Sequence, residues 1–186
     1  MSGANKMAKD WVASHVRDGQ TVLELGSGTG ALSQEMLDAG CRVFSVDSAP
    51  DRGIVRKPDL IVDLVHVPWK WAKDSSFDVV VAMFCLQHLI GREVYAWGEI
   101  SRVLKKGGTL IASGRHRMKV PHFEWDRSEP LKGDNRTTII GLCSASGFQM
   151  RDFATAFYTP EDCSEAPPEV SNAWAMTAIC TKGLKP

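Results

Sequence analysis

The sequence predicts an α/β fold with three layers, in which a doubly wound and mostly parallel sheet of about seven strands lies between helices. Short apolar runs bounded by glycine or aspartate alternate along the chain with segments whose apolar residues recur every three or four positions. This alternation is typical of parallel strands joined by helical crossovers, which cover both faces of a sheet. The chain has 186 residues, of which 44% are hydrophobic and 24% charged, and this composition suits one globular domain.

The N-terminal elements follow from periodicity and from glycine stops. Residues 4–17 place apolar side chains on one helical face, and the Asp18-Gly19 break ends that helix. Residues 21–25 are mostly apolar and bounded by glycine, which suits a strand buried on both faces. Residues 31–39 carry leucine and methionine at helical spacing, and Gly40 is a natural C-terminal stop. We therefore expect a helix, a strand and a second helix.

The next strands are short and end at aspartates. Residues 41–46 form a strand that leads to Asp47, and residues 60–62 form one that leads to Asp63. Residues 77–83 contain three consecutive valines, and β-branched side chains fit a pleated, buried surface. This segment is the clearest strand of the chain.

The C-terminal half begins with an amphipathic helix. Residues 93–104 have apolar side chains at spacings of three and four, and the helix is expected to close with Lys105-Lys106 before Gly107-Gly108. The remaining expected elements are a strand at 109–113, a helix at 137–145 and strands at 148–154 and 173–180.

Composition and charge argue against several classes of protein. Lys and Arg total 22 and Asp and Glu also total 22, so no net positive charge attracts a nucleic acid, and such a partner is unlikely. The five cysteines form no CxxC pair, which favours reduced thiols. No apolar run approaches the ~20 residues that cross a bilayer. We expect a cytoplasmic protein without membrane or metal, whose oligomeric state stays open.

A glycine-rich turn follows the first strand. Gly26, Gly28 and Gly30 let the backbone approach a ligand closely and present the N–H groups of the following helix. The spacing also satisfies the dinucleotide fingerprint in its alanine form, with Ala31 last and Asp47 near the distance expected for a ribose contact. Taken alone, this turn leaves the type of cofactor open.

Further blocks of sequence distinguish between these cofactors. The run Val22–Gly30, with Glu24 two places before the first glycine, resembles the first motif of class I, Rossmann-like S-adenosylmethionine-dependent methyltransferases. The blocks that resemble later motifs of that family, in the same order, are Asp63–Trp69, Phe77–Val81 with Leu86–Leu89, and Glu99–Gly108, where Lys106 replaces the common proline. The resemblance is to the small-molecule type of methyltransferase-11/25, and beyond residue 113 only a strand pattern remains of it.

The resemblance implies S-adenosyl-L-methionine as cofactor, S-adenosyl-L-homocysteine as product, and a small-molecule acceptor. It implies one domain over residues 1–186, with an N-terminal helix at 1–20, a cofactor-binding half at 21–113 and a substrate-side half at 114–186. The residues expected to bind the cofactor are Glu24, Gly26, Ser27, Gly28, Gly30, Asp47, Ser48, Asp63, Leu64, Met83 and Phe84.

Residue chemistry suggests a role for several of these positions. The two carboxylate oxygens of Asp47 suit two vicinal ribose hydroxyls, and Asp63 suits the adenine amino group, beside the backbone N–H of Leu64. Glu24 orders the glycine turn or meets the cofactor's ammonium through water. A backbone carbonyl of Met83 or Phe84 is expected to accept from that ammonium.

Residues of the acceptor site follow from position and charge. His88 comes one turn after the strand at 77–83, and imidazole exchanges a proton near neutrality, so His88 is the candidate general base; shaping of the pocket is its alternative role. The candidate acceptor-binding residues are Arg115, His116, Arg117 and Trp125. The basic stretch suits an anionic acceptor, and a solvated charge run is its alternative.

Two other functions remain open at this stage. A nicotinamide-dependent oxidoreductase uses the same type of sheet, but neither Tyr95 nor Tyr158 has a lysine four residues on. A protein that binds S-adenosylmethionine without turnover is the second, since no general base is assured. The acceptor atom, whether O, N, S or C, is not specified by the sequence.

Overall fold

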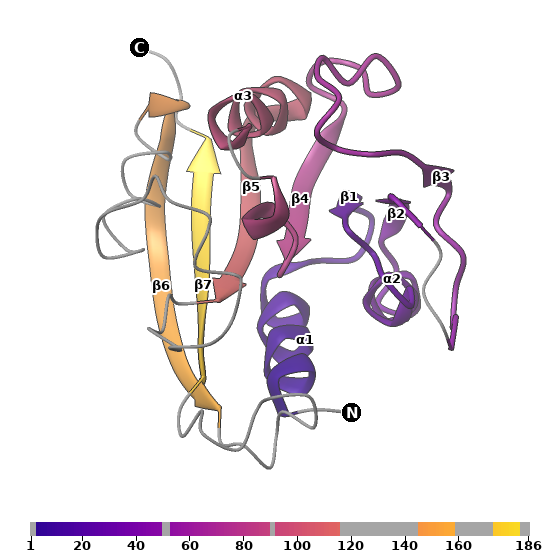
Figure 1. Ribbon diagram of the computed structural model, residues 1–186, viewed down its shortest axis with the longest axis vertical. Helices are drawn as coiled ribbons and strands as arrows, with labels where there is room; N and C mark the ends of the chain where they lie inside the picture. Colours follow the sequence, from indigo (N-terminus) through magenta and orange to yellow (C-terminus); the bar gives the residue numbers. More distant parts are fainter. Residues whose placement is uncertain (1–2, 50–52, 90–91, 116–144, 159–172, 183–186) are drawn as a thin grey trace, which may run out of the picture.

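The structure is a computed structural model, which describes residues 3–49, 53–89, 92–115, 145–158 and 173–182. Its elements in chain order are α1 (Gly3–His15), β1 (Thr21–Leu25), α2 (Ala31–Asp38), β2 (Arg42–Asp47), β3 (Leu60–Ile61), β4 (Phe77–Met83), the 3₁₀ turn η1 (Leu86–His88), α3 (Glu93–Val103), β5 (Leu104–Arg115), β6 (Phe148–Tyr158) and β7 (Ala173–Lys182). Figure 1 shows how these elements are arranged.

The strands form a seven-stranded sheet in the order β3-β2-β1-β4-β5-β7-β6. β1 pairs in parallel with β2 and β4, and β4 in parallel with β5, while β7 runs antiparallel between β5 and β6. The chain therefore builds outward from β1 in one direction and then from β4 in the other. In sheets of this kind ligands bind at the carboxyl ends of the strands where the direction switches, which here is the edge between β1 and β4.

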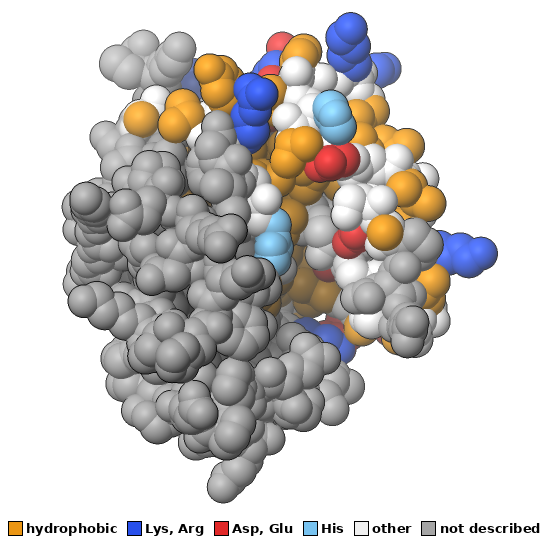
Figure 2. Space-filling model, viewed as in Figure 1, with side chains coloured by type: hydrophobic (Ala, Val, Ile, Leu, Met, Phe, Trp, Pro, Cys, Tyr) orange, Lys and Arg blue, Asp and Glu red, His pale blue; other side chains and the backbone are white. Residues whose placement is uncertain are grey.

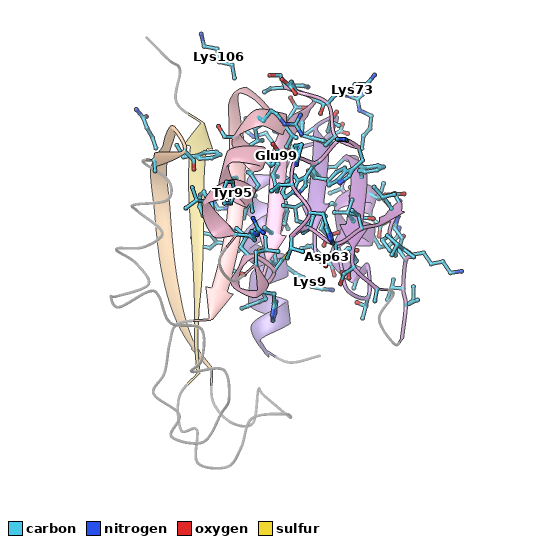
Figure 3. The ribbon with its side chains drawn as sticks, turned by 45° about the horizontal axis from the view of Figure 1, so that its top comes forward. Lys9, Asp63, Lys73, Tyr95, Glu99 and Lys106 are labelled. Atoms are coloured by element: carbon cyan, nitrogen blue, oxygen red, sulfur yellow. The ribbon has the colours of Figure 1, made fainter. Side chains whose placement is uncertain are left out.

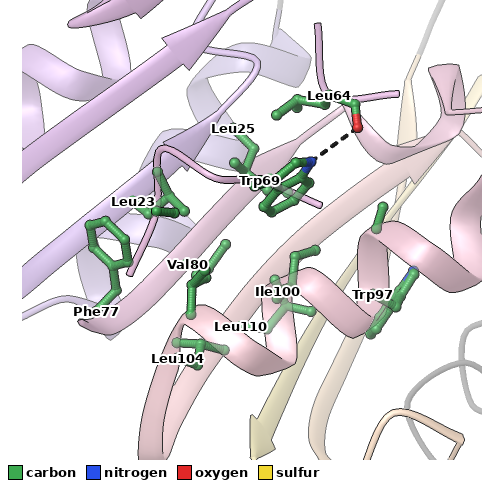
Figure 4. Packing of buried hydrophobic residues seen from close by; sticks show 14 of the residues in the cluster. Leu23, Leu25, Leu64, Trp69, Phe77, Val80, Trp97, Ile100, Leu104 and Leu110 are labelled. Atoms are coloured by element: carbon green, nitrogen blue, oxygen red, sulfur yellow. Dashed lines mark hydrogen bonds between the residues drawn. The ribbon is translucent and has the colours of Figure 1, made fainter. Parts of the chain in front are cut away.

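Helices pack against both faces of the sheet, so the predicted three-layer fold is confirmed. Val22, Val79 and Val81 are fully buried in a cluster with Val12 of α1 and Met36 of α2. The strand residues between them point the other way, as the pleat requires. The face they form packs against α3 and the segment after β3, and Figure 4 shows this larger cluster.

Trp69 anchors the segment that follows β3. Its side chain is fully buried, and its indole Nε1 donates to the Leu64 carbonyl at 3.1 Å (Figure 4). Its backbone N–H donates to Glu99 Oε2 at 2.7 Å, and Arg102 Nη2 donates to its carbonyl at 3.0 Å. Because the core and α3 hold Trp69 in this way, the residues just after β3 are fixed at the edge of the sheet.

The boundary between α3 and β5 differs from the prediction. The helix expected at 93–104 ends at Val103, and Lys105 and Lys106 belong to a strand that begins at Leu104, five residues before the expected start at 109. Leu104 is fully buried and pairs with Phe77. Burial and strand pairing therefore determine the structure of this segment, although its sequence continues the helical periodicity.

The other expected elements agree with the structure to within a few residues. The strands at 21–25 and 77–83 are confirmed without change, and β6 and β7 are longer than the predicted strands. The helix expected at 137–145 lies outside the described residues except for Ala145. Among the described helices, none is long and apolar enough to cross a membrane.

Candidate functional site

The glycine loop after β1 lies at the switch point of the sheet. The N–H groups of Gly26 and Ser27 both donate to the Val46 carbonyl of β2, at 2.9 and 3.2 Å. The Gly30 N–H donates to the Ser27 carbonyl at 2.8 Å and closes the loop before α2 begins. The loop is therefore tied to the end of the neighbouring strand.

Two loop positions require glycine for steric reasons. Gly26 has a φ of 69°, and a Cβ built there lies 2.7 Å from Cys85 Sγ. Gly30 has a φ of 73°, and a Cβ there lies 2.1 Å from the Arg56 carbonyl oxygen. Left-handed backbone and close neighbours both disfavour any larger side chain. These positions explain why the turn needs at least two of its glycines.

Asp47 at the end of β2 connects two parts of the site. Its Oδ2 accepts from the Gly28 N–H at 2.7 Å, and its Oδ1 accepts from the Ala49 N–H at 3.1 Å. Each carboxylate oxygen retains a second lone pair for a ligand. Ser48, predicted beside it, is exposed. The structure thus brings the predicted ribose-binding carboxylate directly against the glycine loop.

Ser27 and the start of α2 offer polar groups to a ligand. Ser27 is 7% exposed, and among the described residues its Oγ has no hydrogen-bond partner. α2 begins after Gly30, which gives no side-chain cap to the first turn. An unpaired buried hydroxyl beside an uncapped helix start fits a polar or anionic ligand group. A cofactor with charged groups at its methionine end suits these donors.

Glu24 of β1 lies buried beneath the loop and faces α2. It is 3% exposed, and its carboxylate accepts from Ser33 Oγ of α2. The pKa of Glu24 is raised to about 7, chiefly by burial and to a smaller extent by the charge of Asp47, while the Ser33 hydrogen bond and the charge of Arg56 lower it. The hydrogen bond from Ser33 to Glu24 therefore ties β1 to α2, the two elements that flank the glycine loop.

The buried Glu24 should make stability depend on pH. Its pKa is about 7 in the folded protein against 4.5 ordinarily, so between these values the native state binds more protons than the unfolded state. The free energy of unfolding should therefore fall by about 3 kcal/mol as pH rises from 4.5 to 7, and level off above. Urea unfolding of Glu24→Gln should lack this fall, and Glu35→Gln on the exposed face of α2 should keep it. If Glu24→Gln showed the same fall in the free energy of unfolding as the wild type, another group would be its cause.

The end of β4 carries backbone strain at the same edge. Phe84 has a φ of 53°, unusual for a residue with a side chain. Its N–H donates to the carbonyl and to Oγ of Ser113, at 3.0 and 3.1 Å, and these bonds hold the strained turn. Such strain is typical of ligand sites. Met83 is half-buried and packs against the α1 and α2 face of the core.

Cys85 and His88 follow this turn. Burial raises the pKa of the Cys85 thiol to about 12, and the charges of Asp47 and Glu24 add to this, so it stays protonated and is a poor nucleophile. His88 ends η1, with an exposed side chain and a backbone N–H that donates to the Cys85 carbonyl at 3.0 Å. His88 therefore follows β4 closely, at the carboxyl edge of the sheet.

Asp63 and Leu64 follow β3 at that edge too. Asp63 is exposed, and its Oδ1 accepts from the Val65 N–H at 3.0 Å. The Leu64 side chain is buried, and its carbonyl accepts from Trp69 as described above. Leu64 therefore has a backbone fixed by the core, whereas the Asp63 carboxylate remains accessible to solvent.

The predicted acceptor-binding residues are largely beyond what the structure describes. Arg115 ends β5, but its side chain is not described. His116, Arg117 and Trp125 lie outside the described residues. Within the described part of the chain, no three His, Cys, Asp or Glu side chains gather as a metal site. The acceptor side of the site therefore stays a prediction.

A hollow in the surface lies against α3. It measures about 340 Å³ and is lined by Val67, Pro68, Tyr95 and Glu99, of which Tyr95 and Glu99 are labelled on α3 in Figure 3. The hydrogen bonds of Arg102 to Glu99 lower the pKa of that carboxyl, and it also accepts the Trp69 N–H. The Glu99 carboxylate that lines this hollow is thus already hydrogen-bonded to Arg102 and Trp69.

The surface charge is mixed on the face shown in Figure 2. Side chains of Lys and Arg are interspersed with those of Asp and Glu over the described part of this face. Equal totals of 22 basic and 22 acidic residues agree with this picture. A polyanion would find no broad basic patch on the described part of this face.

Sequence reasoning missed the polar groups that support the loop. Ser33, Ser45, Arg56 and Asp59 contact one another or Glu24, and Ser113 holds Phe84. One signal was available: Ser33 and Ser45 are fully buried, and each occupies an apolar-facing position of its predicted element. A serine in such a position indicates a buried polar partner.

Comparisons with known proteins agree with this geometry. The family described as Methyltransferase domain matches residues 23–112. A cypemycin N-terminal methyltransferase from Streptomyces is 39% identical over 151 residues, which cover 75% of this chain and 62% of that protein. A demethylmenaquinone methyltransferase from Beutenbergia cavernae is 34% identical over 103 residues, covering 52% of this chain and 41% of that one. The chain thus spans less than two thirds of either relative.

Solved structures show the same fold. The [4+2]-cyclase SpnF matches with a TM-score of 0.71 and 18% identity, over 96% of this chain and 81% of its own. A 1,6-didemethyltoxoflavin-N1-methyltransferase from Burkholderia thailandensis, solved with S-adenosylhomocysteine, matches with a TM-score of 0.70 and 17% identity, over 98% and 80%. The predicted class I, Rossmann-like fold is thus confirmed, and residues 23–112 match a methyltransferase domain, a type of domain that takes S-adenosylmethionine as its cofactor.

Proposed function

We propose that this protein transfers the sulfonium methyl group of S-adenosylmethionine to a nucleophilic atom of a small-molecule acceptor. The observation that carries the proposal is the match of residues 23–112 to a methyltransferase domain. The 2.7 Å contact between Asp47 and Gly28 supports it, because it brings a carboxylate suited to ribose hydroxyls against the glycine loop of that domain. When bound, the cofactor supplies an electrophilic methyl group. The protein has to bind it, align the acceptor and exclude water.

Different residues of the site are expected to bind different parts of the cofactor. We propose that Asp47 accepts from the ribose hydroxyls, with Ser48 beside it, and that Asp63 and the Leu64 N–H bind the adenine. The glycine loop, with Ser27 Oγ, and the carbonyls of Met83 and Phe84 bind the methionine end. In support, the positions named here all lie at or just after the carboxyl ends of β1 to β4, where ligands bind in open α/β sheets.

The acceptor is expected to bind chiefly to residues of the C-terminal half, 114–186. We propose that His88 removes the acceptor proton where one must leave, and that Arg115, His116, Arg117 and Trp125 bind the acceptor. In support, the His88 side chain is exposed in the turn that follows the carboxyl end of β4. This division places the cofactor on residues 21–113 and the acceptor on the remaining half.

A second class of acceptor has specific support. The relative that is 39% identical is named as an N-terminal methyltransferase of cypemycin, so a terminal amine is an alternative nucleophile. A terminal amine that is protonated has no free lone pair, so it must lose a proton before it can attack the methyl group, which gives His88 the same role.

A panel assay for S-adenosylhomocysteine release tests the proposal. Phenols, thiols, heterocyclic amines and short peptides with free or acetylated N-termini are each offered with S-adenosylmethionine. Release with a small molecule supports the first acceptor class, and release with free but not acetylated peptides supports the second. Binding of S-adenosylmethionine without release on any member would instead indicate a non-catalytic binding protein.

Asp47→Ala should weaken the binding of S-adenosylhomocysteine. Loss of charge-assisted hydrogen bonds to the ribose costs about 1 to 3 kcal/mol, which is about 5- to 150-fold in Kd. Calorimetry measures this, with Asp38→Ala on α2 as a control that removes the same charge. Asp47→Asn, which keeps one acceptor oxygen, should fall between. If a folded Asp47→Ala protein binds as tightly as Asp38→Ala, the ribose assignment fails.

A further inference from the structure

Arg56, in the segment between β2 and β3, lies over the glycine loop. The N–H groups of Val55 and Arg56 both donate to the Thr29 carbonyl, at 2.8 and 3.1 Å. The Arg56 carbonyl lies so close to Gly30 that a Cβ there would be 2.1 Å from its oxygen. The backbone at Arg56 therefore covers the last turn of the loop.

The guanidinium of Arg56 reaches back to the sheet. Its Nη1 donates to Ser45 Oγ at 2.8 Å and to Asp59 Oδ2 at 3.2 Å, and its Nη2 donates to Asp59 Oδ1 at 2.8 Å. Asp59 in turn accepts from the N–H and hydroxyl of Ser45 at 2.8 and 3.0 Å. The Arg56 side chain is 22% exposed. A fixed and mostly covered positive charge results.

The Arg56 guanidinium contacts Ser45 of β2, the strand next to the one that carries Glu24. Ser45 pairs with Glu24 across β1 and β2, and paired residues of a parallel sheet present their side chains on the same face. The other polar or titratable groups near Glu24 are Ser33 of α2, Asp47 of β2, Asp59 beside Arg56, and Cys85 after β4. Arg56 is the group of opposite charge that acts on the Glu24 carboxyl.

We propose that Arg56 is a positioning residue of the cofactor site, which fixes the glycine loop through its backbone and favours the ionised form of the Glu24 carboxyl through its guanidinium. The proposal rests on the proposed function, because the loop is taken as the one that binds S-adenosylmethionine. That cofactor carries a sulfonium and an ammonium, so a carboxylate beneath the loop attracts it. By lowering the pH at which Glu24 ionises, Arg56 lets the site bind the cofactor tightly at neutral pH as well as at higher pH.

The proposal has a signature that a packing role lacks. If Arg56 only packed against the loop, its loss would weaken binding equally at every pH. If it keeps Glu24 ionised, its loss lets the carboxyl titrate at higher pH, because a nearby positive charge favours the ionised form. The loss of affinity is then greatest near and below neutral pH and is recovered at higher pH.

The experiment combines two measurements on one set of variants. Carboxyl ¹³C NMR follows the titration of Glu24 in the cofactor-free protein, and calorimetry gives Kd for S-adenosylhomocysteine from pH 6 to 9. Arg56→Gln and Arg56→Met both remove the charge, so the test does not depend on the folding of one variant. Arg56→Lys keeps the charge, and Arg42→Gln removes an exposed arginine of β2 as a control.

The expected result is an upward shift of the Glu24 midpoint by about half a pH unit or more in the neutral variants, restored by lysine. The pH at which affinity is lost should move with it, and Glu24→Gln should remove the pH dependence with or without Arg56. An unshifted Glu24 midpoint, or affinity lost equally at all pH values, overturns the proposal. Absence of binding by the wild type at every pH overturns the proposed function instead, while the NMR titration still tests the electrostatic link.

Discussion

Replacement of His88 by alanine is expected to lower kcat by about 10²- to 10⁴-fold, with the affinity for S-adenosylhomocysteine almost unchanged. His88 is exposed at the carboxyl edge of the sheet, in the 3₁₀ turn that follows β4. A general base acts in the transition state, so its loss falls on kcat more than on binding of the cofactor. Steady-state kinetics on the acceptor found by the panel assay, together with calorimetry, measure both quantities.

The control for this prediction is His15→Ala. His15 ends α1, where its ring lies 5.1 Å from the ring of Trp11, away from the glycine loop. Its replacement should leave kcat within about twofold of wild type. If kcat of His88→Ala also stays within about threefold, His88 has no role as a base, and alignment of the reactants is the mechanism.

Gly30→Ala is expected to destabilise the protein by about 2 to 5 kcal/mol and to abolish measurable binding of the cofactor. A side chain in left-handed backbone costs about 1 to 2 kcal/mol, and overpacking adds about 1 to 3 kcal/mol. The added methyl group meets the Arg56 carbonyl oxygen, a backbone atom that moves only if the loop or the covering segment moves. Displacement of the loop also breaks the alignment of Gly28 with Asp47.

Gly53→Ala separates strain from collision. Gly53 has a φ of 71°, close to the 73° of Gly30, but no atom of the described residues lies within 4 Å of a Cβ built there. It should lose only the conformational part, about 1 to 2 kcal/mol, and bind the cofactor normally. Urea unfolding and calorimetry compare the two variants. Equal losses in both would show that the contact with Arg56 is unimportant.

The fold is predictable from the sequence because its signals are local. The valines of β4 and the glycine-bounded run of β1 mark strands whose limits need no knowledge of the rest of the chain. The start of β5 is different, since Leu104 continues the helical periodicity of α3 and only its pairing with Phe77 makes it a strand. That pairing joins residues far apart in the sequence.

The candidate site divides in the same way. The loop glycines and Asp47 are recognisable by spacing, and the structure brings them into contact. Arg56 shows no such pattern, because its importance comes from Thr29 and Gly30 of the glycine loop and from Ser45 of β2, which lie in two other segments. Supporting contacts of this kind depend on tertiary structure and cannot be derived from periodicity or motif spacing.

Calorimetric titration of the wild-type protein with S-adenosylhomocysteine and with NADH tests the central claim, that the edge between β1 and β4 binds S-adenosylmethionine. The geometry of Gly28 and Asp47 alone suits either a nicotinamide cofactor or S-adenosylmethionine, and the match of residues 23–112 to a methyltransferase domain favours S-adenosylmethionine. The account predicts one site for S-adenosylhomocysteine and no heat of binding for NADH. Binding of NADH with no binding of S-adenosylhomocysteine would contradict it and assign the glycine loop to a dinucleotide.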